Sequence, residues 1–318
     1  MHRDEDNPAL AVKVVVLMST WQGERHVEQQ MDSVLRQLPA GGIVIVRDDG
    51  STDGTVQRIE NFGDARITLI RGKNVGFVRS FFSLLDAAPD DADFVMLCDQ
   101  DDVWLPHKIS RAVAHLQRFD GVPALYCSRL ELVDEALTPL GLSPEWKRGP
   151  SFRNALTENI VTGCTCGINR AALPLARQYG NLNSIYFHDW WLYLVVAAFG
   201  EVIVDPEPTI LYRQHAGNAI GMGSGLGRYL AILRFLRKKN WVHIMFDQLE
   251  NFRAVHGSQL SSGDQLLLER YFDPQSPAAM ARSLLSPVRF RQSLTGDALL
   301  RLLILGSILS GRGLATTR

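Results

Sequence analysis

Apolar, β-branched runs alternate with helical patterns through the first part of this chain of 318 residues. The strand-like runs are residues 11–18 (AVKVVVLM), 43–46, 66–71 and 94–98. Between and beside these runs, apolar side chains recur at helical spacing in residues 27–38, 53–62 and 75–88, and Pro106 marks the start of a further helix. Strands that alternate with helices favour a parallel, doubly wound sheet. We therefore expect an α/β fold with a mostly parallel central sheet flanked by helices.

The pattern becomes irregular after residue 120. The next strand-like runs are residues 124–128, 131–133, 161–168 and 202–204, and a helical pattern covers residues 189–199. From residue 226 onward the sequence is helical in character. These changes predict one domain at residues 1–220, with halves at about 11–120 and 121–220, and a helical C-terminal region at residues 221–318.

Composition describes a folded chain whose charge is unevenly distributed. The hydrophobic fraction is 46% and the net charge is −1. Residues 221–318 nevertheless contain 13 Lys+Arg against 6 Asp+Glu, a balance of +7, which leaves −8 for residues 1–220. We expect two surfaces of opposite sign and no nucleic-acid partner.

The cysteines and the N-terminal residues indicate an intracellular setting. Cys98, Cys127, Cys164 and Cys166 show no zinc-like pair of C-x₂-C spacings, so we expect reduced core thiols. Residues 1–8 lack the apolar centre of a signal peptide, and no run of ~18 apolar residues occurs. These features predict a cytoplasmic protein.

Three carboxylates within four positions end the strand-like run at residues 94–98; they are Asp99, Asp101 and Asp102. Burial of neighbouring like charges is costly, so such a cluster either binds a cation or lies in a solvated turn. Mg²⁺ and Mn²⁺ take one or two carboxylates while substrate phosphates supply other oxygens. The cluster alone leaves both interpretations open.

Three polar loops follow strand-like runs, at residues 19–24, 48–55 and 99–102. Doubly wound sheets bind ligands beyond the carboxyl ends of their strands, so we expect these loops to converge on one edge. Residues 49–60 also match the EF-hand calcium loop, but such a loop needs an entering helix, and residues 43–46 are strand-like. We favour a loop in which Asp49 is free to accept from a nucleobase N–H and Asp53 caps the next helix.

Basic and amide side chains follow the third strand-like run. Asn74, Gly76 and Arg79 lie at a predicted helix start beside Lys73. Positive charge and exposed backbone N–H groups at a helix start suit a diphosphate. A solvated basic helix start is the alternative.

The second half contains two further candidates, one acidic and one imidazole. Asp189 precedes an apolar helix and is either an N-cap or a general base whose proton affinity is raised by apolar neighbours. The adjacent Trp190 and Trp191 are of a kind often found where sugar rings stack. His215 is either a surface histidine or a metal ligand opposite Asp101.

Taken in order, these motifs resemble the nucleotide-sugar-dependent glycosyltransferases of family 2, which have the GT-A fold, over about residues 12–220. The resemblance depends on Ser19-Thr20-Trp21, Asp48-Asp49-Gly50-Ser51-Thr52-Asp53, Asn74-Val75-Gly76, Asp99-Gln100-Asp101-Asp102, Asn159 with Gly163-Cys164, and His188-Asp189. The runs at residues 99–104 and 214–215 are most similar to the bacterial rhamnosyltransferase-like branch, which builds cell-surface polysaccharides.

The resemblance implies roles for individual residues. The set that would bind the nucleotide-diphosphate sugar donor is Thr20, Trp21, Asp49, Asn74, Arg79 and Asp99. A divalent metal, Mn²⁺ or Mg²⁺, would be bound by Asp101 and His215. The acceptor set is Trp190, Gly163 and Cys164, and Asp189 would be the base. The chain departs from the family at Trp21-Gln22, where Tyr-Asn is frequent, and at His188, where Glu is frequent.

We therefore expect inverting transfer of one sugar, with rhamnose as a candidate, to a polysaccharide or lipid-linked acceptor. The Gln-x-x-Arg-Trp signature of processive members is absent, which favours a single addition. A nucleotidyltransferase and a non-catalytic sugar- or calcium-binding module are the alternatives. The nucleotidyltransferase is disfavoured because residues 19–24 contain a single glycine rather than a Gly-rich basic loop.

The C-terminal region leaves its own partner open. Residues 226–239 (LGRYLAILRFLRKK) mix Leu, Ile and Phe with Arg and Lys, and residues 297–309 are more apolar. Basic amphipathic helices can lie on anionic membranes, here the inner face of the cytoplasmic membrane. They can equally pack on the catalytic domain or form a homodimer face.

Overall fold

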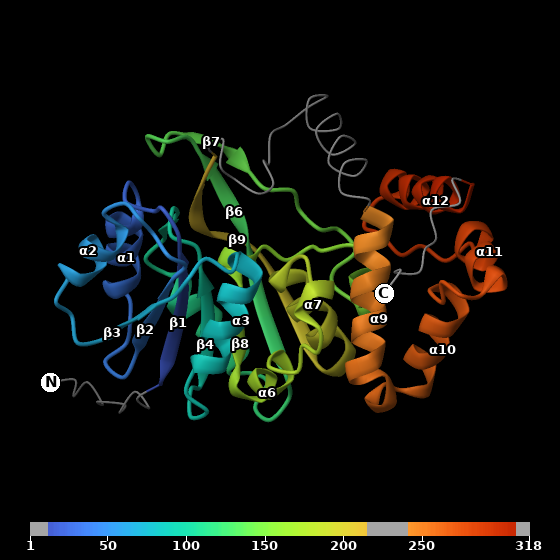
Figure 1. The fold of residues 1–318 in the computed structure, drawn as a ribbon, viewed down its shortest axis with the longest axis horizontal. Helices are drawn as coiled ribbons and strands as arrows, with labels where there is room; N and C mark the ends of the chain where they lie inside the picture. Colours follow the sequence, from blue (N-terminus) through green and yellow to red (C-terminus); the bar gives the residue numbers. More distant parts are fainter. Residues whose placement is uncertain (1–11, 215–240, 310–318) are drawn as a thin grey trace, which may run out of the picture.

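A nine-stranded sheet forms the centre of the protein in the computed structural model, which describes residues 12–214 and 241–309 (Figure 1). The strand order is β3 (Ile67–Arg71), β2 (Ile43–Asp48), β1 (Val14–Thr20), β4 (Phe94–Cys98), β8 (Gly167–Asn169), β6 (Ala124–Val133), β9 (Glu201–Arg213) and β5 (Val103–Trp104), and β7 (Pro139–Leu142) pairs with β6. β3, β2, β1 and β4 are parallel, while β8 runs antiparallel between β4 and β6. The predicted mixed α/β fold with a mostly parallel sheet is confirmed.

Helices cover both faces of the sheet because its strands are apolar on both sides. In β1, Val15 and Leu17 belong to one hydrophobic cluster, and Val14, Val16 and Met18 belong to the other. The second cluster also contains side chains of α1 (Val27–Leu35) and α4 (Lys108–Leu116). The first contains side chains of α3 (Phe77–Ala87) and α7 (His188–Phe199).

The remaining helices are short or C-terminal. Between the strands the chain forms α2 (Thr55–Glu60), α5 (Phe152–Ala155), α6 (Leu173–Ala176) and the 3₁₀ turns η1 (Gly163–Thr165), η2 (Arg170–Ala172) and η3 (Leu182–Ser184). The C-terminal region contains α9 (Trp241–His256), η4 (Gly257–Gln259), α10 (Ser262–Tyr271), α11 (Pro277–Leu285) and α12 (Leu294–Leu309). Figure 1 shows α9 beside α7, with the other three helices beyond it. Among the described helices, none is long and apolar enough to span a bilayer.

Several predicted boundaries were wrong in the second half of the chain. Residues 124–128 and 131–133 form one strand, β6, and residues 202–204 are part of the 13-residue β9. These two strands pair with each other, and that distant pairing extends both beyond their apolar runs. Residues 161–168 were predicted as a strand, but only β8 is extended, after the turn η1. Pro106 precedes α4, whose N-cap is His107.

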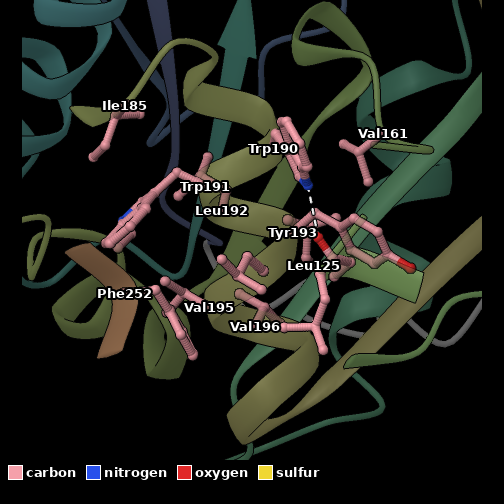
Figure 2. Packing of buried hydrophobic residues seen from close by; sticks show 14 of the residues in the cluster. Leu125, Val161, Ile185, Trp190, Trp191, Leu192, Tyr193, Val195, Val196 and Phe252 are labelled. Carbon is pink, nitrogen blue, oxygen red and sulfur yellow. Dashed lines mark hydrogen bonds between the residues drawn. The ribbon is translucent and has the colours of Figure 1, made fainter. Parts of the chain in front are cut away.

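Trp190 and Trp191 of α7 are core residues, 1% and 0% exposed. The Trp190 ring stacks on Trp241 of α9, with centroids 4.9 Å apart, and its Nε1 donates to the Ala155 carbonyl at 2.7 Å. Figure 2 shows the two indole rings leaving α7 in different directions, with Phe252 below Trp191. The predicted role of Trp190 in stacking on an acceptor sugar was therefore wrong, because the ring is enclosed by protein.

We predict that Trp190→Ala lowers the free energy of unfolding by about 3–5 kcal/mol, because it removes a buried ring and leaves a cavity between α7 and α9. Chemical denaturation followed by circular dichroism measures this change. Trp21→Ala is the control, since its ring is 55% exposed and its loss should cost less than about 0.5 kcal/mol. Equal stability of the two variants would contradict the core assignment.

Candidate functional site

The three polar loops converge at the carboxyl edge of the parallel strands, as predicted. Trp21 N donates to Gln100 Oε1 at 2.8 Å, and Gln100 Nε2 donates to the Trp21 carbonyl at 2.9 Å. Thr52 N donates to Gln22 Oε1 at 2.7 Å. The loops after β1, β2 and β4 are thus joined directly to one another.

The loop after β2 is organised by two buried carboxylates. Asp48 Oδ2 accepts from Thr20 Oγ1 at 3.1 Å and from Ser51 Oγ at 2.6 Å. Asp49 accepts from the backbone N–H groups of Val75 and Gly76 at 2.9 Å, and from the Arg47 guanidinium. Asp49 was predicted to be free to accept from a nucleobase. Its carboxylate instead accepts from the start of α3 and so connects this loop to that helix. Sequence reasoning missed the part played by Asp48, although it stands beside Asp49.

The EF-hand interpretation fails because residues 43–48 form a β-strand rather than an entering helix. Asp53 Oδ1 instead accepts from Thr55 N and from the Thr55 hydroxyl, at 3.1 and 2.5 Å. Asp53 thus accepts from the first residue of α2 and lies one position before the N-cap, Gly54, so its role is close to the capping role that was predicted.

The start of α3 faces solvent beside these loops. Asn74 is exposed, and the helix has no capping side chain, so its first N–H groups suit an anion. Arg79, also exposed, donates to Asn183 Oδ1 at 2.7 Å. Trp21, Val75 and Phe77 expose 55%, 41% and 46% of their surface, which provides apolar area next to the polar loops.

The acidic cluster at the end of β4 is strongly perturbed. Burial, together with the carboxylates of Asp101 and Asp189, raises the pKa of Asp99 to about 7. Burial and the carboxylates of Asp101 and Asp99 raise the pKa of Asp102 well above its usual range. Such shifts arise when negative charges are held together away from water, and they cluster at functional sites.

The atoms that this cluster offers as metal ligands can be compared with the ligands that a divalent cation requires. Within the described ranges 12–214 and 241–309, one group of three ligand atoms lies within 4.8 Å, from Asp99, Asp102 and Cys164. Asp102 is 1% exposed; its Oδ1 accepts from Arg213 N at 3.1 Å, while its Oδ2 receives no N–H or O–H donor and faces only the weak donor of the Cys164 thiol. The carboxylates of Asp99 and Asp102, one of which has this buried oxygen without an N–H or O–H donor, are oxygen ligands of the kind that a hard cation takes. Burial raises the pKa of the Cys164 thiol well above its ordinary value, so the sulfur is a poorer ligand.

The predicted metal ligands are placed differently. Asp101 lies outside this group of three, and His215 lies outside the residues that the structure describes. Asp102 was predicted to support the turn, and its bond to Arg213 N does join the turn to β9. Cys164, predicted to face an acceptor, is fully buried behind the acidic cluster, so that prediction was wrong.

Asp189 begins α7 on the other side of the same edge. Its Oδ2 accepts from Gly163 N at 3.0 Å and its Oδ1 from Trp190 N at 2.8 Å, and the Asn159 side chain donates to it as well. Burial nevertheless raises the pKa of Asp189 to about 6. A carboxylate with that pKa is ionised near neutral pH yet basic enough to take a proton.

His188 fills the space between α3 and η1. Its ring stacks on Phe81, with centroids 4.1 Å apart, and meets the edge of Phe77 at 5.9 Å. Both ring nitrogens are buried without hydrogen-bond partners, and burial lowers the pKa of His188 to about 3, so the ring is neutral. A methyl group at Gly163 would lie 2.6 Å from His188 Nε2, so residue 163 must be glycine for this packing.

The turn η1 therefore contacts both Asp189 and the acidic cluster at the end of β4. Gly163 holds Asp189 through its N–H, and the next residue, Cys164, lies against Asp99 and Asp102. The predicted acceptor role of Gly163 stays a prediction, whereas its hydrogen bond to Asp189 is a structural finding.

We predict that Gly163→Ala lowers the free energy of unfolding by about 1–3 kcal/mol, because the added methyl group collides with a stacked, immobile ring. His188→Ala should relieve that collision, so the double variant should lose less stability than the two single changes added together. Thermal unfolding of all four proteins gives the coupling. Strict additivity would show that the contact does not limit residue 163.

Comparisons with known proteins show the family to which this chain is similar. The model of the family "Glycosyl transferase family 2" matches residues 15–173. The dTDP-rhamnosyl transferase RfbG of Shigella flexneri is 30% identical over 223 residues, which cover 64% of this chain and 73% of that protein. An uncharacterized glycosyltransferase of Haemophilus influenzae is 26% identical over 217 residues, covering 64% of this chain and 65% of that protein.

Solved structures share the fold at low sequence identity. S. aureus TarS matches with a TM-score of 0.54 and 16% identity over 96% of this chain and 93% of that chain. The mannosyltransferase PcManGT from Pyrobaculum calidifontis, solved with GDP-Man and Mn²⁺, matches with a TM-score of 0.50 and 17% identity, over 93% of this chain and 80% of that one. With a family match across half of its length and a 30% identical relative, this chain belongs to glycosyl transferase family 2.

Proposed function

We propose that this glycosyltransferase transfers a single sugar from a nucleotide-diphosphate donor to a glycan acceptor, with inversion at the anomeric carbon. The observation that carries the proposal is the position of Asp189. Its carboxylate, with a pKa raised to about 6, lies close enough to Asp99 to raise the pKa of that residue too. The proposed base and the acidic cluster lie at the same edge of the sheet as the polar loops that we propose to bind the nucleotide.

Asp189 is the proposed base. It takes the proton of an acceptor hydroxyl as that oxygen bonds to the anomeric carbon, on the face opposite the nucleoside diphosphate. The bond between the anomeric carbon and the diphosphate oxygen breaks at the same time, so the product has the opposite configuration. The N–H groups of Gly163 and Trp190 hold the carboxylate in place for this transfer.

The donor is proposed to lie along the joined loops. Trp21, which is exposed, lies beside the nucleoside and is available for stacking. Thr20 was predicted to contact the donor, but it is 1% exposed and its hydroxyl donates to Asp48, so it supports the loop instead. Asn74, Arg79 and the uncapped start of α3 lie toward the diphosphate. Asp49 acts through structure, since it fixes the start of α3 against the β2 loop.

A divalent cation, Mn²⁺ or Mg²⁺, would neutralise negative charge on the diphosphate when bound. Asp99 and Asp102 are the described residues whose carboxylates fit it, with Asp101 and His215 as the ligands that the family resemblance implies. These carboxylates also keep the donor sugar near Asp189 through their position at the end of β4.

Rhamnose is the proposed sugar, on the similarity to a dTDP-rhamnosyl transferase. The proposed acceptor is a lipid-linked glycan of a cell-surface polysaccharide. An Escherichia coli protein that is 26% identical to this chain, WfgD, has a name that describes a glucosyltransferase acting on a diphosphoundecaprenol-linked sugar. This similarity supports an acceptor of that class. The reaction would then take place at the inner face of the cytoplasmic membrane.

Release of nucleoside diphosphate from a panel of UDP-, GDP- and dTDP-sugars with Mn²⁺ tests the proposal. We expect one nucleotide class to be cleaved, and Asp189→Asn to lower the rate by about 10²–10⁴-fold, because the base is lost. Asp32→Asn, at an exposed position on α1, should keep the wild-type rate. If folded Asp189→Asn retains full activity, or if no donor is cleaved, the proposal is wrong.

The acid limb of the pH profile should report Asp189. Burial raises its pKa from 3.8 to about 6, so the ionised base predominates only above about pH 6. We expect kcat/KM to rise with pH through about 6 and then to level off, with a slope of one on the acid side. Initial rates at subsaturating donor from pH 4.5 to 8 measure this. A profile that stays flat down to pH 5 would contradict the assignment.

A further inference from the structure

α12 (Leu294–Leu309) buries Leu300 and Ile304 in the core but also exposes apolar side chains on its outer face, which a surface helix normally keeps polar. Its charged residues face the protein: Asp297, 6% exposed, accepts from Phe290 N at 2.9 Å and pairs with Arg301 at the same distance. The Arg301 guanidinium also donates to backbone carbonyls at the end of α11 and in the loop that follows it. Surface helices usually turn such groups to water and apolar groups inward.

The outward face of the helix is apolar along its length. Leu302, Leu305 and Leu309 are 65%, 40% and 77% exposed, and Ala298 is exposed one turn earlier. The spacing of four, three and four residues places all four side chains on one stripe of the helix. Ile308, 41% exposed, widens that stripe. We call these five residues the α12 stripe.

Charge in the C-terminal region favours one kind of partner. Residues 241–309 contain six Lys+Arg and six Asp+Glu, so they are neutral overall. Residues 215–240 and 310–318 contain seven Lys+Arg and no Asp or Glu, and they flank the neutral part on both sides in the sequence. A second copy of the chain would bring like charges together, whereas an anionic surface would attract both segments.

We propose that the α12 stripe docks on an anionic lipid bilayer, in the plane of the membrane interface. From Ala298 to Leu309 the stripe spans about 17 Å along the helix, which is too short to cross a bilayer but long enough to enter one lengthwise. The cationic residues that flank this part of the sequence would add electrostatic attraction to the anionic lipid. This proposal does not depend on the identity of the sugar or on Asp189.

Sedimentation with lipid vesicles tests the proposal on the full chain. Wild-type protein should bind vesicles containing 30% phosphatidylglycerol, bind phosphatidylcholine vesicles at least tenfold less, and dissociate in high salt. The double variant Leu302→Glu/Leu305→Glu should lose at least tenfold in affinity, since both changes put a carboxylate into the apolar stripe. Leu266→Glu is the matched control, because Leu266 is 57% exposed on α10, outside the stripe, and should bind like wild type.

Three further measurements separate the outcomes. The thermal unfolding midpoint of the double variant should equal that of wild type, because both positions are exposed, and its donor cleavage without vesicles should be unchanged. Light scattering after size exclusion should give the same mass for all three proteins. Wild-type protein that ignores anionic vesicles, a double variant that binds them equally well, or a wild-type dimer that the double variant dissociates would overturn the proposal.

Discussion

Carboxyl groups held close together with little access to water dominate the site of this protein. Asp99 and Asp102 follow β4 and Asp189 lies in the first turn of α7, and burial raises the pKa of each. Keeping three such groups at one edge costs folding free energy, and we propose that a ligand that carries or recruits positive charge offsets this cost. In that proposal a cation accompanies the diphosphate, which links the acidic cluster to binding of the donor.

The short turn η1 couples the two parts of the site. Gly163 holds the Asp189 carboxylate, and Cys164 packs against the acidic cluster, so a shift of this turn would move Asp189, the proposed base, relative to that cluster. The neutral ring of His188 packs between this turn and Phe81 of α3. Asp49 in turn accepts a hydrogen bond from the start of α3. The polar loops, the acidic cluster and Asp189 therefore form one connected unit, and in the proposed reaction a misplacement of about 1 Å can cost much of the rate.

The sequence predicted the first half of the fold well because the signals there are local. Residues 94–98 form the predicted strand, and the three polar loops meet where parallel strands end. The second half depends on the pairing of β6 with β9, which joins residues about 80 positions apart and has no local signature. Periodicity predicted the α/β class with its mostly parallel sheet, whereas the GT-A assignment and the expectation of glycosyl transfer came from family resemblance.

Individual site residues were predicted less well, for physical reasons. Two adjacent tryptophans look alike in sequence whether they stack on sugar or on Trp241, since only tertiary packing distinguishes a core from a cleft. Asp49 carries the expected charge, but its partners at Val75 and Gly76 come from a loop 26 residues away. Asp102 and Cys164 lie close together because Cys164 is in the turn η1, and a three-residue turn has no periodic sequence pattern by which it could be predicted.

The affinity of the protein for nucleoside diphosphates, with and without a divalent cation, tests the central claim most directly. Isothermal titration of UDP, GDP and dTDP should show one nucleotide bound in Mn²⁺, and binding about tenfold weaker or more in a chelator, because the buried carboxylates then repel the diphosphate. Equal affinity in Mn²⁺ and in chelator would contradict the account, since the acidic edge would then have no part in binding the donor.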